Sequence, residues 1–372
     1  MRIAEVIAYP LTTPIADDQQ KTSQGAFGTV SIVVVELRTD DGLVGHGEAL
    51  ARYAPRAYKA LIDEQLTPRV LGADPFDAGA LWQKMFRTFT GQSGGMLIEA
   101  IAAIDIACWD LMGKAIGQPV HKLLGGVGRE RVHAYASSIA WASDAVAVAQ
   151  TKAALKQGFD LIKVKIGGPA DQAIERCRLI RETVGPQVRL AADANWAFDL
   201  DDAVKVARAL HALDYHWFEE PLVPEDREGL RRLRDAVPIR FTAGESEHTV
   251  FGARELIASR AVGIVQPDVA RSGGISETRD IAALARAFHV GYAPHVGASG
   301  AVCAAASLHL AAAMPNFVTF ECMTFRNPLR ERLTKAKVGD PDALVDSTVA
   351  VPQGHGLGIE LDFDVLESFR VG

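Results

Sequence analysis

The chain has 372 residues, of which 48% are hydrophobic and 23% are charged, and its net charge is −7. This composition is typical of a globular protein with a large core and one or two domains. Negative net charge without a dense Lys/Arg stripe argues against nucleic acid or an anionic membrane as a partner. The sequence has no apolar run of the roughly 18 residues that a membrane helix needs and no signal peptide pattern, so we expect a soluble, cytoplasmic protein.

The first 125 residues predict an α+β domain. Two β-branched runs at 4–11 and 30–49 indicate strands, the second broken by the turn sequence TDDGL. Helical spacing of apolar residues follows at 57–71, 78–89 and 95–117. The four cysteines are scattered without CxxC spacing, which indicates neither a disulfide framework nor a thiolate zinc site.

From residue 126 to about 326, short apolar strands alternate with amphipathic helices. This rhythm favours a closed parallel barrel, with a doubly wound open sheet as the alternative. We expect residues 327–372, which include the turn sequence GHGLG, to return to the first domain. Eight strands are predicted, at 132–137, 161–166, 188–193, 216–221, 239–245, 263–268, 290–295 and 317–322.

The predicted strands from the second to the eighth end in ionisable residues. In parallel barrels the active site lies at the C-terminal ends of the strands, so these side chains are candidates for one site. Ordinary solvated loop ends are the alternative interpretation for any one of them. The candidates are Lys163, Lys165, Asp193, Glu219, Glu245, Asp268, His295 and Glu321, with Asn195 beside Asp193.

Asp193, Glu219 and Glu245 predict a metal site. They are spaced 26 residues apart, one strand-helix unit each. Three inward carboxylates repel one another unless a cation neutralises them, and oxygen ligands favour Mg²⁺, with Mn²⁺ as a possible replacement. The alternative is that the carboxylates only pair with the lysines.

The lysine pair in LIKVKIG predicts a base. Lys163 and Lys165 point to the same face of a strand. Mutual repulsion and a nearby dication would lower the pKa of Lys165 so that it can act as the base, while Lys163 would tune Lys165 and contact a substrate carboxylate. Asp268 would orient His295 for proton transfer. Glu321, if protonated, could donate a hydrogen bond to an oxyanion, which requires a raised pKa.

These residues resemble the enolase superfamily and, within it, the mandelate racemase subgroup. The motifs are KVK at 163–165, DAN at 193–195, FEEP at 218–221, GES at 244–246, QPD at 266–268, PH at 294–295 and FE at 320–321. The resemblance covers nearly the whole chain. It implies a modified (β/α)7β barrel with a capping domain, bound Mg²⁺, a small-molecule carboxylate substrate, and usually a homo-oligomer.

The resemblance also implies the reaction class: removal of the proton α to a carboxylate, giving an enediolate. The muconate-lactonising type resembles this fold but uses a second lysine on strand six. Here no lysine occurs between Lys205 and Lys335, which argues against that type. The loops 17–29 and 48–55 would set specificity, and they offer Lys21, Gln24, Arg52 and Tyr53. We expect dehydration of an acid sugar to a 2-keto-3-deoxy acid. The alternatives are a racemase or epimerase, a sugar-lactone cycloisomerase and, more remotely, a non-catalytic barrel that binds a metal or carboxylate.

Overall fold

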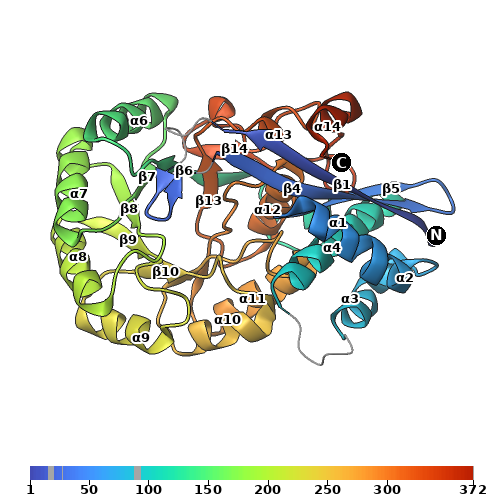
Figure 1. Ribbon diagram of the computed structural model, residues 1–372, viewed down its shortest axis with the longest axis horizontal. Helices are drawn as coiled ribbons and strands as arrows, with labels where there is room; N and C mark the ends of the chain where they lie inside the picture. Colours follow the sequence, from blue (N-terminus) through green and yellow to red (C-terminus); the bar gives the residue numbers. More distant parts are fainter. Residues whose placement is uncertain (16–20, 27, 88–93, 372) are drawn as a thin grey trace.

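The computed structural model describes residues 1–15, 21–26, 28–87 and 94–371. Two parts are visible in Figure 1: a barrel ringed by helices, and a capping domain with a three-stranded sheet and its own helices. Residues 17–20 and 27 of the predicted specificity loop lie outside the described residues.

The capping domain is built on an antiparallel sheet in the order β1-β4-β5, with β1 at Ile3–Pro14, β4 at Thr29–Thr39 and β5 at Val44–Ala49. Helix α4 (Met96–Ile116) packs against β5 because Gly45 and Gly47 have no side chain there. A Cβ on Gly47 would lie 1.8 Å from the Ala103 carbonyl oxygen. The remaining elements are β2 (Lys21–Thr22), β3 (Gly25–Ala26), α1 (Pro55–Leu61), the π-helix η1 (Ile62–Leu66), α2 (Thr67–Val70), the 3₁₀ helix η2 (Pro75–Asp77) and α3 (Ala78–Phe86).

Eight parallel strands form the curled sheet of the second part, in the order β12-β11-β10-β9-β8-β7-β6-β13. An isolated parallel bridge between Tyr292 and Phe317 connects β12 to the segment before β13 and closes the ring. The predicted modified barrel is confirmed. Its strands are β6 (Arg131–Ile139), β7 (Leu161–Lys165), β8 (Arg189–Asp193), β9 (Tyr215–Glu219), β10 (Phe241–Ala243), β11 (Ile264–Val265), β12 (Gly291–Tyr292) and β13 (Phe320–Met323).

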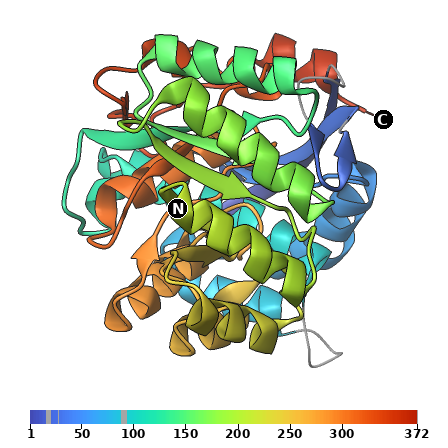
Figure 2. The ribbon, with the colours of Figure 1, turned by 90° about the vertical axis from the view of Figure 1, so that its left-hand side faces the viewer.

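Helices cover the outside of this barrel. Neighbouring helices from α6 to α9 lie side by side over the strands, as Figure 2 shows. The helices are α5 (Val120–Leu123), α6 (Asp144–Gln157), α7 (Ala170–Val184), α8 (Leu200–Ala212), α9 (Arg227–Ala236), α10 (Thr249–Ala258), α11 (Gly274–Ala287) and α12 (Ala301–Ala313).

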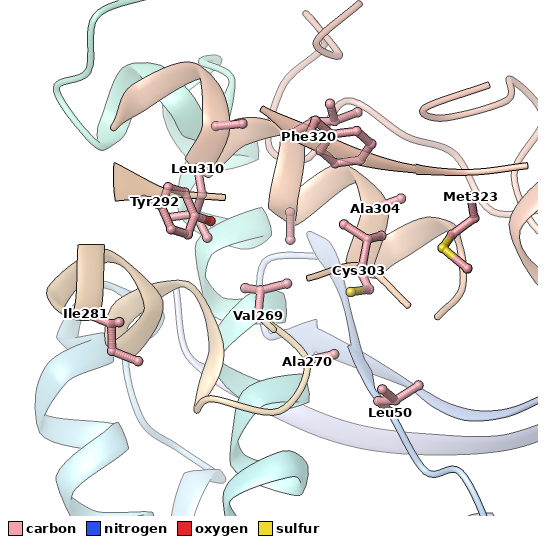
Figure 3. Close-up of a cluster of buried hydrophobic side chains, with 14 of the residues drawn as sticks. Leu50, Val269, Ala270, Ile281, Tyr292, Cys303, Ala304, Leu310, Phe320 and Met323 are labelled. Carbon is pink, nitrogen blue, oxygen red and sulfur yellow. The ribbon is translucent and has the colours of Figure 1, made fainter. Parts of the chain in front are cut away.

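Helix α12 is the one barrel crossover that the sequence pattern did not predict. All of its residues are buried, so its sequence is apolar on every side and lacks the amphipathic period of its neighbours. It packs between the barrel and the capping domain. Figure 3 shows Cys303 and Ala304 of this helix among buried barrel residues and Leu50 of the capping domain.

A small apolar layer fills the inside of the barrel below the polar strand ends. In this layer the rings of Tyr135 and Trp217 meet edge to face, with centroids 5.2 Å apart. Such a packed interior is characteristic of barrels, and it leaves the polar side chains to face the C-terminal mouth. The layer consists of Tyr135, Leu161, Ala191, Trp217, Ile264 and Ala293.

The C-terminal segment contacts both parts of the molecule. β14 (Thr348–Ala350) pairs with β6 of the barrel, whereas α14 (Phe363–Phe369) contacts β1 and Val371 N donates to Pro10 O at 2.9 Å. The segment also holds α13 (Pro328–Glu331) and the 3₁₀ helix η3 (Pro341–Ala343). The division at residues 125 and 326 stays a prediction. Among the described residues, no helix is long and apolar enough to cross a membrane.

Candidate active site

Three carboxylates stand next to one another at the C-terminal ends of consecutive strands. Asp193 and Glu219 are register partners at the ends of β8 and β9, and Glu245 follows β10 by two residues. All three side chains are buried, with at most 4% of Glu245 exposed. Parallel pairing therefore brings together the acidic residues that the sequence places 26 residues apart.

Both predicted lysines reach these carboxylates. Lys163 Nζ contacts Glu219 and also lies 2.9 Å from Glu321 Oε1 and 3.3 Å from Asp193 Oδ2. Lys165 Nζ forms a short contact with Asp193. The ion pairs that the sequence left as the alternative interpretation are thus present.

The pKa of Lys163 depends on the carboxylates around it. Burial alone would lower it, but the charges of Glu219 and Glu321 raise it well above the ordinary value of 10.5. Repulsion from a second ammonium group and a dication favours a lowered pKa, and the carboxylates that surround Lys163 act in the opposite direction. The carboxylates around Lys163 therefore favour its ammonium form.

Glu219 has further partners that were not among the candidate residues. Its Oε2 accepts hydrogen bonds from Gln266 Nε2 at 2.8 Å and from Trp217 Nε1 at 3.1 Å. Burial, opposed by Lys163, raises the pKa of Glu219 to about 7. The signal for Gln266 was its place in QPD, two residues before Asp268.

The contacts of Asp193, Glu219 and Glu245 bear on the predicted metal site. Within the described parts of the chain, no three Asp, Glu, His or Cys side chains converge as they stand into a set that could hold a metal ion. The donor chemistry nevertheless fits a hard dication, because three buried carboxylates supply only oxygen atoms. Glu245 is also incompletely paired: its carboxylate lies 3.4 Å from His295 Nε2 and 3.7 Å from Arg52 Nη2, longer than the roughly 2.8 Å of a good charged hydrogen bond.

His295 and Asp268 form the predicted dyad. His295 Nδ1 lies 2.7 Å from Asp268 Oδ2, while Asp268 Oδ1 accepts from the backbone N–H of Ala270 at 2.9 Å. Cys303 Sγ lies 3.8 Å from the same Oδ1. Burial alone would lower the pKa of His295, but the charges of Glu245, Glu321 and Asp268 raise it. The surrounding carboxylates therefore favour the protonated form of this imidazole.

The groups around Glu321 lower its pKa, which is the opposite of the shift that a protonated donor needs. Its Oε2 accepts from the backbone N–H groups of Val296 at 2.7 Å and Gly297 at 3.1 Å, and its Oε1 accepts from Ser137 Oγ at 2.7 Å. Burial would raise its pKa, but Lys163 and His295 hold that pKa well below 4.5. Glu321 instead anchors Lys163 and the loop after His295.

A cavity of about 380 Å³ opens over these groups. Its walls include Lys165, Glu245, His295 and Glu321, together with Arg52 and Tyr53 of the predicted specificity loops and the candidate Asn195. Trp196 and Met323 add apolar surface that the sequence pattern did not indicate. Lys21 does not line this cavity: it is exposed and borders a separate hollow beside Trp141 and Asp144.

Asn195 is held on both sides of its peptide. Its N–H donates to Asp193 Oδ1 at 3.0 Å, and its carbonyl accepts from Ser23 Oγ at 2.9 Å and Gln24 Nε2 at 2.7 Å. Its side-chain Oδ1 is buried without a hydrogen-bond partner among the described residues. The β2-β3 hairpin of the capping domain thus docks beside β7 and β8, as Figure 1 shows.

Comparison with known proteins agrees with this geometry. Residues 5–125 match the N-terminal domain of the mandelate racemase/muconate lactonizing enzyme family, and residues 146–365 match the enolase C-terminal domain-like family. D-galactarolactone cycloisomerase from Agrobacterium fabrum is 33% identical over 98% of this chain and 97% of its own. Arabinonate dehydratase from Saccharolobus solfataricus is 34% identical over 92% of this chain and 91% of its own.

Solved structures show the same relationship. A racemase from Streptomyces coelicolor with bound magnesium superposes with a TM-score of 0.89 at 28% identity, covering 99% of this chain and 100% of its own. The mandelate racemase-like protein of Bordetella bronchiseptica gives a TM-score of 0.94 at 34% identity over 100% and 95% of the two chains. The chain is therefore an enzyme that belongs to the mandelate racemase/muconate lactonizing enzyme family of the enolase superfamily.

Proposed function

We propose that this enzyme dehydrates an acid sugar to a 2-keto-3-deoxy acid. The observation that carries the proposal is one cavity that holds a lysine, Lys165, and an oriented imidazole, His295, beside the buried carboxylates. Removing the proton α to a carboxylate needs a base and strong electrostatic stabilisation of the resulting dianion. Arabinonate dehydratase, at 34% identity, supports an acid-sugar substrate.

Asp193, Glu219 and Glu245 would hold Mg²⁺, and Mn²⁺ would suit the same oxygen ligands. When bound, the ion would supply positive charge for the substrate carboxylate and for the enediolate. The magnesium in the related racemase from Streptomyces coelicolor supports this assignment.

Lys165 and His295 would carry out the two proton transfers. In the proposed dehydration, Lys165 or His295 takes the C2 proton of the substrate, and protonated His295 gives a proton to the departing C3 hydroxyl. Water and an enol are the products, and the enol becomes the 2-keto-3-deoxy acid by tautomerisation. Lys165 Nζ contacts Asp193, and it can accept the C2 proton only as the free amine. Lys163 remains charged and supplies a fixed positive field beside Glu321.

Cycloisomerisation of a sugar lactone is the second candidate. The relative from Agrobacterium fabrum, which matches over nearly the whole of both chains, carries that activity in its name. The same base and acid would serve, because only the fate of the enediolate differs. A homo-oligomer stays a prediction.

Proton NMR in D₂O tests the proposal. The enzyme with Mg²⁺ is incubated with a panel of aldonic acids, aldaric acids and their lactones. We expect one substrate to lose its C2 proton signal while a C3 methylene signal appears. A new ring product would favour the cycloisomerase, and exchange at C2 without loss of water would favour a racemase or epimerase.

Two controls sharpen this experiment. Removing the metal with EDTA should stop C2 exchange, and adding Mg²⁺ should restore it. The Glu219→Gln variant should fail in the same way at any Mg²⁺ concentration that serves the wild type. Failure of every acid in the panel, with Mg²⁺ bound, would reject the acid-sugar assignment.

A further inference from the structure

Among the described residues, three cationic side chains border the active-site cavity, and two of them have close carboxylate partners. Lys165 is paired with Asp193, and His295 is oriented by Asp268. Arg52 is the third. It comes from the capping domain, from the loop that follows β5.

Arg52 has unused hydrogen-bonding capacity. Its Nε is buried without a hydrogen-bond partner among the described residues, and its nearest carboxylate oxygen, Glu245 Oε1, lies 3.7 Å from Nη2. A buried donor without a partner is costly, and a guanidinium offers donors in a fork that fits a carboxylate. Only 23% of the side chain is exposed, so bulk water reaches little of it.

The loop that carries Arg52 is fixed to the barrel. Leu50 N donates to Ala270 O at 3.4 Å, and the two residues lie close together in Figure 3. Glu48, just before this loop, accepts backbone hydrogen bonds from the barrel at Gly300 and Cys303. The loop is therefore fixed to the barrel before any ligand binds, which lowers the entropy cost of presenting Arg52 at the cavity.

We propose that Arg52 binds a second carboxylate of the substrate, so that the enzyme prefers dicarboxylic acid sugars, the aldaric acids or their lactones, to aldonic acids. This inference rests on the proposed function, which places the first carboxylate at the Mg²⁺ ion that Asp193, Glu219 and Glu245 would hold. Glu245 and Glu321 also border the cavity and repel a second anion. A dicarboxylate therefore needs a dedicated cation, whereas the hydroxyl end of an aldonic acid does not.

A matched pair of ligands tests the inference: a six-carbon aldonic acid, and the aldaric acid that differs from it only by oxidation of C6. Calorimetry with Mg²⁺ gives the Kd of each acid for wild type, Arg52→Met and Arg52→Lys, and C2 proton exchange in D₂O gives the rates. Arg56→Met is the control, because Arg56 lies on the exposed face of α1 and its loss changes the net charge equally.

The wild type should bind the aldaric acid more tightly. Arg52→Met should weaken that binding by about 10- to 100-fold, the range expected for lost charged hydrogen bonds, and change the aldonic acid by less than about threefold. Arg52→Lys should lose less, and Arg56→Met should match the wild type. Mg²⁺ affinity should not fall in the Arg52 variants, because a cation beside Glu245 opposes the binding of another cation.

Three results would overturn the inference. Equal losses for both acids, or weakened Mg²⁺ binding in Arg52→Met, would mean that Arg52 acts through Glu245. Preference of the wild type for the aldonic acid would reject the dicarboxylate class while the proposed dehydration stands. In contrast, selective binding loss without C2 exchange in any acid would keep the anion site and reject the proposed function.

Discussion

Glu48 Oε1 in the capping domain accepts a hydrogen bond from the backbone N–H of Gly300 in the barrel, at 2.6 Å. Its Oε2 accepts from Cys303 N at 3.0 Å, so one carboxylate satisfies two N–H groups at the N-terminus of α12. Free N–H groups and the helix dipole favour negative charge at that end of a helix. Because Cys303 Sγ also lies 3.8 Å from Asp268 Oδ1, this contact joins the two domains directly behind the dyad.

The buried carboxyl group of Glu48 should make the unfolding free energy depend on pH. Burial, opposed by the N–H groups of Cys303 and Gly300, raises the pKa of Glu48 from 4.5 to about 7. The native protein thus holds this proton more tightly than the unfolded chain does. The stabilisation that this proton gives the native state is complete below pH 4.5 and is lost as the pH rises through 7. It amounts to at most ~3 kcal/mol of unfolding free energy. The difference in unfolding free energy, wild type minus Glu48→Gln, should therefore fall between pH 5 and 8.

Chemical denaturation at a series of pH values measures this difference. Glu64→Gln, on the exposed side of η1, controls for the removal of one carboxylate. A difference between wild type and Glu48→Gln that grows with pH would mean that folding lowers the pKa of Glu48 instead of raising it.

Glu219→Gln should weaken Mg²⁺ binding by at least roughly tenfold and reduce turnover with it. A neutral amide cannot replace a charged ligand, and its N–H groups would oppose the donors Gln266 and Trp217. Calorimetric titration with Mg²⁺ measures the affinity apart from activity. Glu247→Gln is the matched control, since Glu247 is a buried glutamate that pairs with Arg227. Unchanged Mg²⁺ affinity in Glu219→Gln would remove this residue from the metal site.

The sequence predicted the barrel and its polar mouth because both depend on local pattern. Each parallel strand is a short apolar run, and the residue at its end reveals which side chains meet at the mouth. Asp193 and Glu219 illustrate this, since their equal positions at the ends of β8 and β9 become register partners. The hairpin of β2 and β3 carries no comparable pattern, because each of its strands has only two residues.

Charge pairing and side-chain direction were less predictable from the sequence than the barrel and its polar mouth. Lys163 has a raised pKa because Glu219, Glu321 and Asp193 come from three other strands, and only the folded geometry shows that all three reach it. The pKa of Glu321 is lowered because Lys163 and His295 reach it from other strands. Lys21 was expected at the substrate on loop membership alone, yet it borders a different hollow. Residues that share a loop can face different cavities.

His295→Asn should abolish net turnover and leave C2 exchange at Lys165. Asparagine cannot transfer the proton that the departing hydroxyl needs, whereas Lys165 keeps its own partner, Asp193. NMR in D₂O separates exchange from product formation. His289→Asn is a suitable control, because His289 is exposed and asparagine tolerates its left-handed φ of 59°. Full turnover in His295→Asn would exclude the dyad from the mechanism.

Ser23→Ala should raise KM by roughly threefold to tenfold with a smaller effect on kcat. Ser23 Oγ lies 2.7 Å from Ala194 O and 2.9 Å from Asn195 O, so its hydroxyl holds the β2-β3 hairpin against the segment that follows Asp193. Losing one such neutral hydrogen bond costs about 1 kcal/mol. The hairpin residues Thr22 and Gln24 border the cavity, so a looser hairpin weakens substrate binding before it affects the proton transfers.

Steady-state kinetics on the best acid of the panel measures both constants for Ser23→Ala. Ser368→Ala, which removes an exposed hydroxyl in α14 bonded only locally to Val365 O, is the control. Mg²⁺ affinity should be the same in all three proteins, because Asp193 keeps its contacts with Lys163 and Lys165. A fall in kcat with unchanged KM would mean that Ser23 positions the reacting groups through Asn195, because a docked hairpin that only encloses substrate acts on KM.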